Sequence, residues 1–446
     1  MGGAISHPST TTSRIFTLDV IRGFGLLGIL SMNIFTFSLN GFAASYMPVT
    51  NQSSIDQFLL IFGFVVCEGK MRGLYSLLFG AGIILVTSQK KKDDLSEADY
   101  YYRRMLWLLA FGLADAYLLL WRGDILYEYA LCGMLLFPFR KLRARYLFLV
   151  GILALCMYLV GTMSIYSGYR DTHLEYVKTQ ELLSTGKKLT DEQKEVRKKW
   201  VEYMTQFPPW KGKYLQDAKD DMKRIQMDYM GGYSDMFGRF KPQIADGQSA
   251  GFYKEFWESL GTILLGMALF KCGFFTGKLN RKIYTLIAVV GISLGYYISW
   301  YIKITTPYKQ SEFFYMYTWQ WYSRTIPIEF SRVITTLAYA SLIVLFCKMK
   351  LFNVAKTAIA KTGKMALTNY IMQTLICSTI FYQIGFDLYG KLDLSQIYCT
   401  VLAVFIFQVI YSNIWMRYFE MGPLEWLWRS LIYWRRQPNR KIQVNL

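Results

Sequence analysis

The chain has 446 residues, of which 53% are hydrophobic, 17% are aromatic and only 18% are charged. A soluble protein would carry about 25% charged residues, and here the charges lie between apolar runs long enough to cross a membrane. The net charge of +19 does not indicate nucleic-acid binding, because the basic residues concentrate in short loops between these runs. Composition therefore predicts an all-α, polytopic transmembrane helix bundle.

Apolar segments of about 20 residues recur about ten times along the chain. They cover residues 16–39, 70–89, 104–121, 124–140, 146–166, 256–276, 283–302, 331–348, 366–386 and 397–417. Residues 55–67 form an additional apolar stretch that is too short to span alone. It is either an interfacial or re-entrant helix that breaks at Gly69, or the outer half of one long tilted helix. The N-terminus has no basic n-region and no cleavage site follows the first span, so we expect this helix to be retained.

The basic residues predict the orientation of the bundle. In the ten-span arrangement their clusters, at 90–104, 140–145, 278–282, 348–364 and 429–441, all fall on one side together with the N-terminus. The short loops of the other side, 41–55 and 387–396, contain only Lys391. The positive-inside rule then places both termini in the cytoplasm of a bacterial inner membrane, with membrane lipids as the surrounding partners.

Four segments follow from this arrangement. Residues 1–166 form the N-terminal half of the membrane bundle, and 167–255 a large extracytoplasmic segment of helices and loops. Residues 256–420 form the C-terminal half, which includes a second outer loop at 303–330. Residues 421–446 form an interfacial amphipathic helix and a basic cytoplasmic tail.

The seven cysteines and two histidines exclude further classes. The cysteines lie mostly in apolar stretches without CxxC or Cys/His spacing, so they indicate neither a disulfide framework nor a zinc site. With only His7 and His173 in the chain, we expect no metal site.

Polar side chains near the cytoplasmic side form the first candidate site. Asp19 and Arg22 lie three residues apart in the first span, on one helix face, where they can neutralise each other. Each costs about 2.5–3.5 kcal/mol in hydrocarbon, which favours a functional role. The alternative is a pair that snorkels to the interface and only fixes the depth of the helix. Asn369 and Gln373, four residues apart, share a face of another span.

The segment after the last span adds two charged residues to this side. Gly422-Pro423 ends the preceding helix, so Glu425 and Arg429 begin a short amphipathic helix that lies in the inner interface. The alternative is an anchor helix with no role in chemistry.

A second candidate site lies near the outer side, where Glu68, Lys70 and Arg72 precede one span and Asp115 lies within the next. These acids and bases converge at one predicted depth. Glu68 and Asp115 are therefore candidate general bases, and Lys70 and Arg72 candidate ligand-binding residues.

The turn after Asp115 adds further charges. Asp124 stands where the N-cap of the following span belongs, which favours a structural role over a catalytic one. Glu128 lies one turn later, and two carboxylates at this spacing repel unless a cation or a proton separates them. Arg122, Arg72 or Lys70 supplies that cation in this interpretation. A carboxylate with a raised pKa here is a candidate general base.

Several stretches resemble the YeiB-like family of bacterial inner-membrane proteins. The first is Arg14-x-x-x-Leu-Asp-x-x-Arg-Gly23. The others are Glu68–Gly82, Gly123–Ala130, Gly261–Leu269, Ala366–Gln373 and Gly422–Arg429. They occur in the right order and cover most of the chain outside 167–255.

The Leu-Asp-x-x-Arg-Gly opening looks like that of the transmembrane acyltransferases, which include the lysosomal enzyme that acetylates heparan glucosamine. This resemblance implies transfer of an acyl group from cytoplasmic acyl-CoA to an acceptor at the outer side, with Arg22 attracting the CoA phosphates. Asn369 and Gln373 would then hold the thioester arm. Many relatives carry a His where this chain has Asp115, so the base here would be a carboxylate.

Two other functions remain open. Two polar clusters at different depths suit a transporter or flippase of a lipid-like or small amphiphilic solute as well as they suit acyl transfer. A non-catalytic protein that binds a partner through residues 167–255 is the third hypothesis, but it leaves the buried charges unexplained. The sequence does not identify the acceptor or the acyl group, and homo-oligomerisation is left open.

Overall fold

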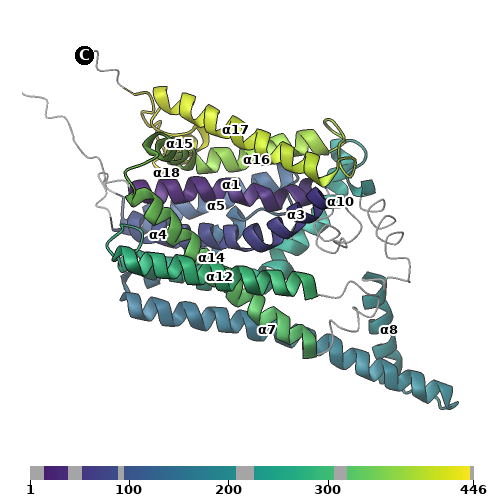
Figure 1. Cartoon of the computed structure of the whole chain (residues 1–446). Helices are drawn as coiled ribbons and strands as arrows, with labels where there is room; N and C mark the ends of the chain where they lie inside the picture. Colours follow the sequence, from purple (N-terminus) through teal and green to yellow (C-terminus); the bar gives the residue numbers. More distant parts are fainter. Residues whose placement is uncertain (1–14, 39–52, 89–94, 207–225, 306–318, 442–446) are drawn as a thin grey trace, which may run out of the picture.

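The computed structural model describes residues 15–38, 53–88, 95–206, 226–305 and 319–441. Within these ranges the chain is a bundle of long helices whose axes run roughly along one direction (Figure 1), so the predicted all-α fold is confirmed. Six segments are long and apolar enough to cross a membrane: Phe16–Ser38, Ser54–Thr87, Ala144–Ser184, Arg281–Ile302, Thr325–Lys348 and Leu394–Tyr418. The count of ten spans stays a prediction.

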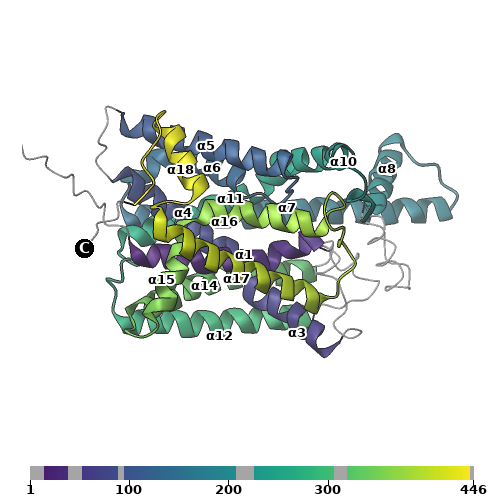
Figure 2. The same cartoon turned by 90° about the horizontal axis from the view of Figure 1, so that it is seen from above.

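Helix α1 (Phe16–Ser38) is the central element of the bundle. It packs against α4 (Lys70–Thr87), α14 (Trp319–Lys348), α15 (Asn353–Lys364), α16 (Ala366–Phe381) and α17 (Leu394–Tyr418). Figure 2 shows α1 enclosed by these helices. Peripheral helices instead present apolar side chains outward, as Leu149, Ile152 and Leu153 do, because lipid solvates them as well as a protein core would.

The segment before α4 forms one interrupted crossing with it. Helix α3 (Ser54–Phe62) continues into the π-helical η2 (Gly63–Cys67), and the helix then breaks at Glu68 and Gly69 before α4 begins. Gly69 adopts a left-handed conformation with φ of 70°, which glycine tolerates because it has no Cβ. The structure thus combines the two alternatives for residues 55–67: the helix breaks at Gly69, and Ser54–Thr87 together is long enough to span.

A second helix with a π-helical segment lies against the first. Helix α10 (Tyr233–Asp246), the π-helical η4 (Gly247–Gly251) and α11 (Phe252–Lys271) follow one another without a break, and α11 packs along α4. The two backbones touch through glycine: a Cβ at Gly80 would lie 2.0 Å from the Ile263 carbonyl oxygen. This close approach fixes how α11 is positioned against α4.

Helix α7 extends well beyond one membrane thickness. It runs unbroken from Ala144 to Ser184, so the segment expected to begin at residue 167 starts inside a continuous helix. Its far part packs against α8 (Asp191–Gln206), where buried Trp200 contacts His173 and Tyr176. The division of the chain into four segments stays a prediction.

The C-terminal half differs from the sequence prediction at one loop. Helix α14 already begins at Trp319, so residues 319–330 are helical and not part of an outer loop; residues 306–318 lie outside the described ranges. Pro327 lies inside α14, where a proline is tolerated if neighbouring groups satisfy the freed carbonyl. Helix α12 (Arg281–Thr305) packs along α14.

The remaining helices define the two ends of the bundle. Helix α5 (Glu97–Leu118) precedes α6 (Leu126–Leu136) and the 3-10 helix η3 (Phe137–Lys141), and α18 (Pro423–Ile432) follows α17. In Figures 1 and 2, α15 and α18 lie at one end, which we call the α18 end. Helices α8 and α10 lie at the opposite end, called here the α10 end.

Candidate functional site

A cavity of about 400 Å³ lies between α1, α4, α5, α6, α16 and α18. Four basic residues line it: Arg22, Arg104, Lys364 and Arg429. They come from the parts of α1, α5, α15 and α18 near the α18 end. Farther from this end the wall is apolar and aromatic, formed by Phe79, Leu108, Leu126 and Tyr129. The cavity is therefore cationic at one end and apolar inside.

Asp19 and Arg22 form an ion pair within α1, with 2.9 Å between Arg22 Nη1 and Asp19 Oδ1. The Asp19 side chain is only 4% exposed, whereas Arg22 is 27% exposed and lines the cavity. The buried carboxylate thus holds the guanidinium at the cavity wall. Arg104 is positioned differently, since its guanidinium stacks 3.9 Å over the Trp428 ring of α18.

Glu425 connects α18 to α16. Its carboxylate accepts hydrogen bonds from the Leu367 amide (2.7 Å), the Thr368 amide (3.1 Å) and the Thr368 hydroxyl (2.5 Å). It therefore caps the first turn of α16, where the helix dipole favours an anion. Burial raises the pKa of the Glu425 carboxyl, while these hydrogen bonds lower it. Helix α18 begins after Gly422 with Pro423 in its first turn, as predicted.

Tyr370 lies at the deep end of the cavity and connects it to a carboxylate. Its hydroxyl accepts hydrogen bonds from the Trp121 indole (3.2 Å) and the Ile125 amide (3.3 Å), and it donates to Asp124 Oδ1 over 3.5 Å. Asp124 also accepts from the Leu126 and Tyr127 amides at 3.2 and 2.8 Å. It caps α6 as predicted, and it is not among the described residues that line the cavity, whereas Tyr370 is.

Asp115 is buried next to the same helix. It is 1% exposed, and its Oδ2 accepts a hydrogen bond of 3.4 Å from Thr374 of α16. Its Oδ1 accepts none from the described residues. Asp115 and Asp124 are thus both attached to α16, through Thr374 and Tyr370 respectively.

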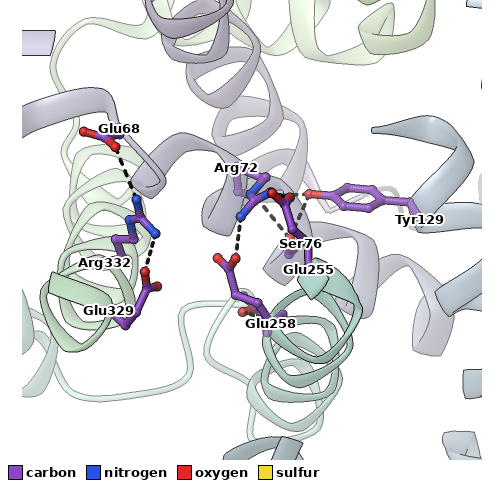
Figure 3. A network of polar contacts seen from close by, with 9 residues as sticks. Glu68, Arg72, Ser76, Tyr129, Glu255, Glu258, Glu329 and Arg332 are labelled. Carbon is purple, nitrogen blue, oxygen red and sulfur yellow. Dashed lines mark hydrogen bonds and ion pairs between the residues drawn. The ribbon is translucent and has the colours of Figure 1, made fainter. Parts of the chain in front are cut away.

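The charged residues at the break between α3 and α4 form a network (Figure 3). Arg72 bridges Glu255 and Glu258 of α11, and Arg332 of α14 bridges Glu68 and Glu329, with 3.3 Å between Arg332 Nη2 and Glu68 Oε1. The prediction that Glu68 and Arg72 belong to one polar region agrees with this arrangement.

Sequence reasoning missed the partners of this network, which are Glu255, Glu258, Glu329 and Arg332. A signal was present, because each pair is spaced i, i+3 on one helix face. Nothing in the sequence showed that α11 and α14 would place these faces against the break.

Tyr129 of α6 separates the cavity from this network. Its ring lines the cavity, while its hydroxyl lies 2.8 Å from the Ser76 hydroxyl and donates to the Arg72 carbonyl at 3.1 Å. The neighbouring Glu128 is 9% exposed and interacts electrostatically with Arg72. Of the three cations proposed to accompany Glu128, Arg72 is therefore the one that faces it.

The other two cations bond elsewhere. Buried Lys70 donates to the Phe64 carbonyl (2.8 Å) and the Ser299 hydroxyl (3.2 Å). Arg122 bonds Gln243 of α10 and Tyr229 near the α10 end.

Asn369 and Gln373 share one face of α16, as predicted, but this face packs against α17. Asn369 donates to the Ser412 hydroxyl at 2.9 Å, and Gln373 donates to Gln408 Oε1 at 3.0 Å. Neither is among the described residues that line the cavity. In this structure they join two helices, and a role in holding a thioester arm is untested.

A bundle with several spanning helices, internal ion pairs and a cavity defines a polytopic membrane protein. Residues 269–435 match the model of a family described as "Protein of unknown function (DUF418)". The uncharacterized protein YxaH of Bacillus subtilis is 28% identical over 98% of both chains. The uncharacterized protein YeiB of Escherichia coli is 29% identical over 94% of this chain and 96% of its own. The chain thus resembles these YeiB-like proteins over nearly its whole length. No solved structure matches it.

Proposed function

We propose that this protein is a membrane-bound acyltransferase that takes its acyl group from an acyl-CoA bound in the cavity. The observation that supports the proposal is the division of the cavity into a basic end and an apolar interior. Guanidinium groups bind phosphates through paired, charge-assisted hydrogen bonds, and acyl-CoA joins several phosphates to a long, largely uncharged arm. A volume of about 400 Å³ lies within the range of small-molecule sites.

The orientation of the protein fits this donor. The positive-inside rule assigns the α18 end to the cytoplasm of the bacterial inner membrane, and with it both termini. Acyl-CoA is a cytoplasmic metabolite, so the basic end would face the compartment that contains it. The acceptor would reach the thioester from the opposite side.

The transfer needs a group that removes one proton. An acceptor hydroxyl or amine attacks the thioester carbonyl carbon, a C–O or C–N bond forms, and the C–S bond breaks. In our proposal Tyr370 takes the proton from the attacking group and passes its own to Asp124. A proton later returns from Asp124 through Tyr370 to the leaving thiolate, which gives free CoA thiol. Catalytic hydrogen bonds are often long in unliganded enzymes, as the 3.5 Å contact between these two residues is.

A second candidate function is transport of an amphiphilic solute, and the break at Gly69 favours it. Interrupted helices with charged side chains near the membrane interior are typical of the substrate sites of secondary transporters. The same cavity would then bind the solute without breaking a bond in it.

Calorimetric titration of the detergent-solubilised protein with acetyl-CoA tests the proposal. We expect saturable binding that weakens about tenfold or more in Arg104→Ala, because a charge-assisted hydrogen bond contributes about 1.5–3 kcal/mol. The matched control is Arg103→Ala, since Arg103 is the same residue type one position earlier and is not a lining residue.

Release of free thiol from acetyl-CoA in the presence of membrane extract then separates the two functions. Thiol release that is lost in Tyr370→Phe supports acyl transfer, whereas binding without thiol release supports transport. Absence of binding at millimolar acetyl-CoA would overturn the acyltransferase.

A further inference from the structure

Helix α4 presents one continuous face to the cavity. The residues of this face recur every three to four positions along about three turns of the helix. They are Tyr75, Leu78, Phe79, Gly82, Ile83 and Val86. Helix α5 contributes a face with the same spacing, formed by Tyr100, Tyr101, Arg104, Met105 and Leu108. The walls that α4 and α5 contribute are therefore mainly alkyl and aromatic.

Gly82 is the position on the α4 face where space is left open. A Cβ at Gly82 would meet no atom of the described residues within 4 Å. Gly80, two residues earlier, differs, because a Cβ there would lie 2.0 Å from the Ile263 carbonyl oxygen of α11. Close packing of two helices thus explains the glycine at position 80. Glycine inside a helix is destabilising relative to alanine, and at Gly82 no such packing compensates for it.

The tyrosine hydroxyls of these walls are bonded within the protein. Tyr101 donates to the Gly133 carbonyl at 2.7 Å, and Tyr75 donates to the Arg22 carbonyl at 3.3 Å. The other side chains of the α4 face are alkyl or phenyl groups, and helical backbone groups bond within their helix. An amide buried here would lose its hydrogen bonds to water, whereas an alkyl chain has none to lose. The wall beside Gly82 therefore suits an alkyl chain better than the amide groups of the CoA arm.

We infer that the cavity takes an acyl-CoA whose acyl chain is longer than acetyl, and that this chain lies against α4 beside Gly82. An acetyl group has a single methyl and cannot contact about three turns of a helix. Gly82 is then a specificity-determining residue, because a side chain there would occupy the space of the methylene groups. The inference rests on the proposed function for the identity of the ligand, and it adds the class of acyl group.

Calorimetric titration of the purified full-length protein in detergent with acetyl-CoA, butanoyl-CoA and hexanoyl-CoA tests this inference. Each methylene group that leaves water for an apolar wall should raise the affinity about three- to fourfold. Gly82→Leu should remove most of this gain and leave the affinity for acetyl-CoA nearly unchanged, because the leucine side chain fills the space of the chain. The matched control is Gly161→Leu in α7. A Cβ at Gly161 also meets none of the described residues within 4 Å, and Gly161 is not among those that line the cavity.

Two results would overturn the inference: equal affinities of the unaltered protein for the three thioesters, or an unchanged dependence on chain length in Gly82→Leu. Either result would leave the proposed function standing, with a short-chain donor. If Gly82→Leu does not fold, Val86→Phe takes its place, since it narrows the same wall one turn later. It should weaken hexanoyl-CoA binding more than acetyl-CoA binding, and an equal effect on both contradicts the inference.

Absence of binding by all three thioesters would overturn the proposed function itself. Butyl phosphate and octyl phosphate, which have an anionic group and an alkyl chain but no CoA, then test the chain site alone. Tighter binding of octyl phosphate that is lost in Gly82→Leu supports an alkyl chain beside Gly82, as transport of an amphiphilic solute would require. Equal binding of the two phosphates, or binding of neither, overturns it.

Discussion

The cavity and the ion-pair network at the helix break lie on opposite sides of Tyr129 and hold their charges differently. Four basic residues and one acidic residue, Glu425, are among the described residues that line the cavity. In the network, Arg72 and Arg332 instead form ion pairs with four glutamates. Charges that face a cavity are available to a ligand, as our acyltransferase proposal requires, whereas the paired charges of the network join the break to α11 and α14.

The largest effect we expect follows removal of the cation that pairs with two carboxylates of the network at the helix break. Arg72→Ala leaves Glu255 and Glu258 without their shared partner, which should cost about 3–5 kcal/mol. Yield and unfolding temperature in detergent measure this loss. The control is Lys194→Ala, which breaks an exposed pair with Asp191 and should cost about 1 kcal/mol or less.

The double variant Arg72→Ala with Glu258→Gln sharpens this result. If the loss in Arg72→Ala arises from carboxylate repulsion, neutralising one carboxylate should recover part of the stability. An equally unstable double variant would show that Arg72 acts by packing alone.

At the cavity, Asp19→Asn should lower the stability by about 1–3 kcal/mol, because it leaves Arg22 without its charged partner. Asp19→Asn with Arg22→Gln should recover folding if the pair is purely structural. Our proposal adds that the double variant folds and yet binds acetyl-CoA more weakly, since the cavity has lost one guanidinium. Unchanged affinity in a folded double variant would contradict a role for Arg22 in binding.

A smaller effect should follow Gly69→Ala at the helix break. A Cβ there would be in the left-handed region and only 2.6 Å from Arg332 Nε, so we expect a loss of about 1–2 kcal/mol. Gly161→Ala in α7 is the control, because a Cβ at Gly161 meets nothing within 4 Å. Equal unfolding temperatures for both variants would show that the break does not require glycine.

Local sequence patterns predicted the parts of these sites that depend on neighbouring residues. Apolar runs predicted the membrane helices, Asp124 its capping role, and Gly422-Pro423 the start of α18. The partners of Arg72 were not predicted, because Glu255 and Glu258 lie more than 180 residues away and depend on how α11 packs along α4.

The same limit applies to helix faces and helix ends. The spacing of Asn369 and Gln373 predicted a shared face but not that this face meets α17. The charged residues after position 166 suggested a separate segment, yet α7 continues to Ser184, because a helix that leaves the membrane can remain helical in water.

The smallest effect concerns pH at the cavity. Burial raises the pKa of Glu425 above its ordinary value near 4.5, so the folded protein holds this proton more tightly than the unfolded chain does. The contribution of this group to stability is therefore complete below about pH 4.5 and decreases as the pH rises through the folded pKa.

The variant Glu425→Gln cannot titrate at this position. Between about pH 5 and pH 8, above the ordinary pKa of a carboxyl group, its unfolding temperature should therefore fall less than that of the unaltered protein. Parallel curves for the two proteins would contradict a titrating Glu425, and the cap on α16 would then remain ionised throughout.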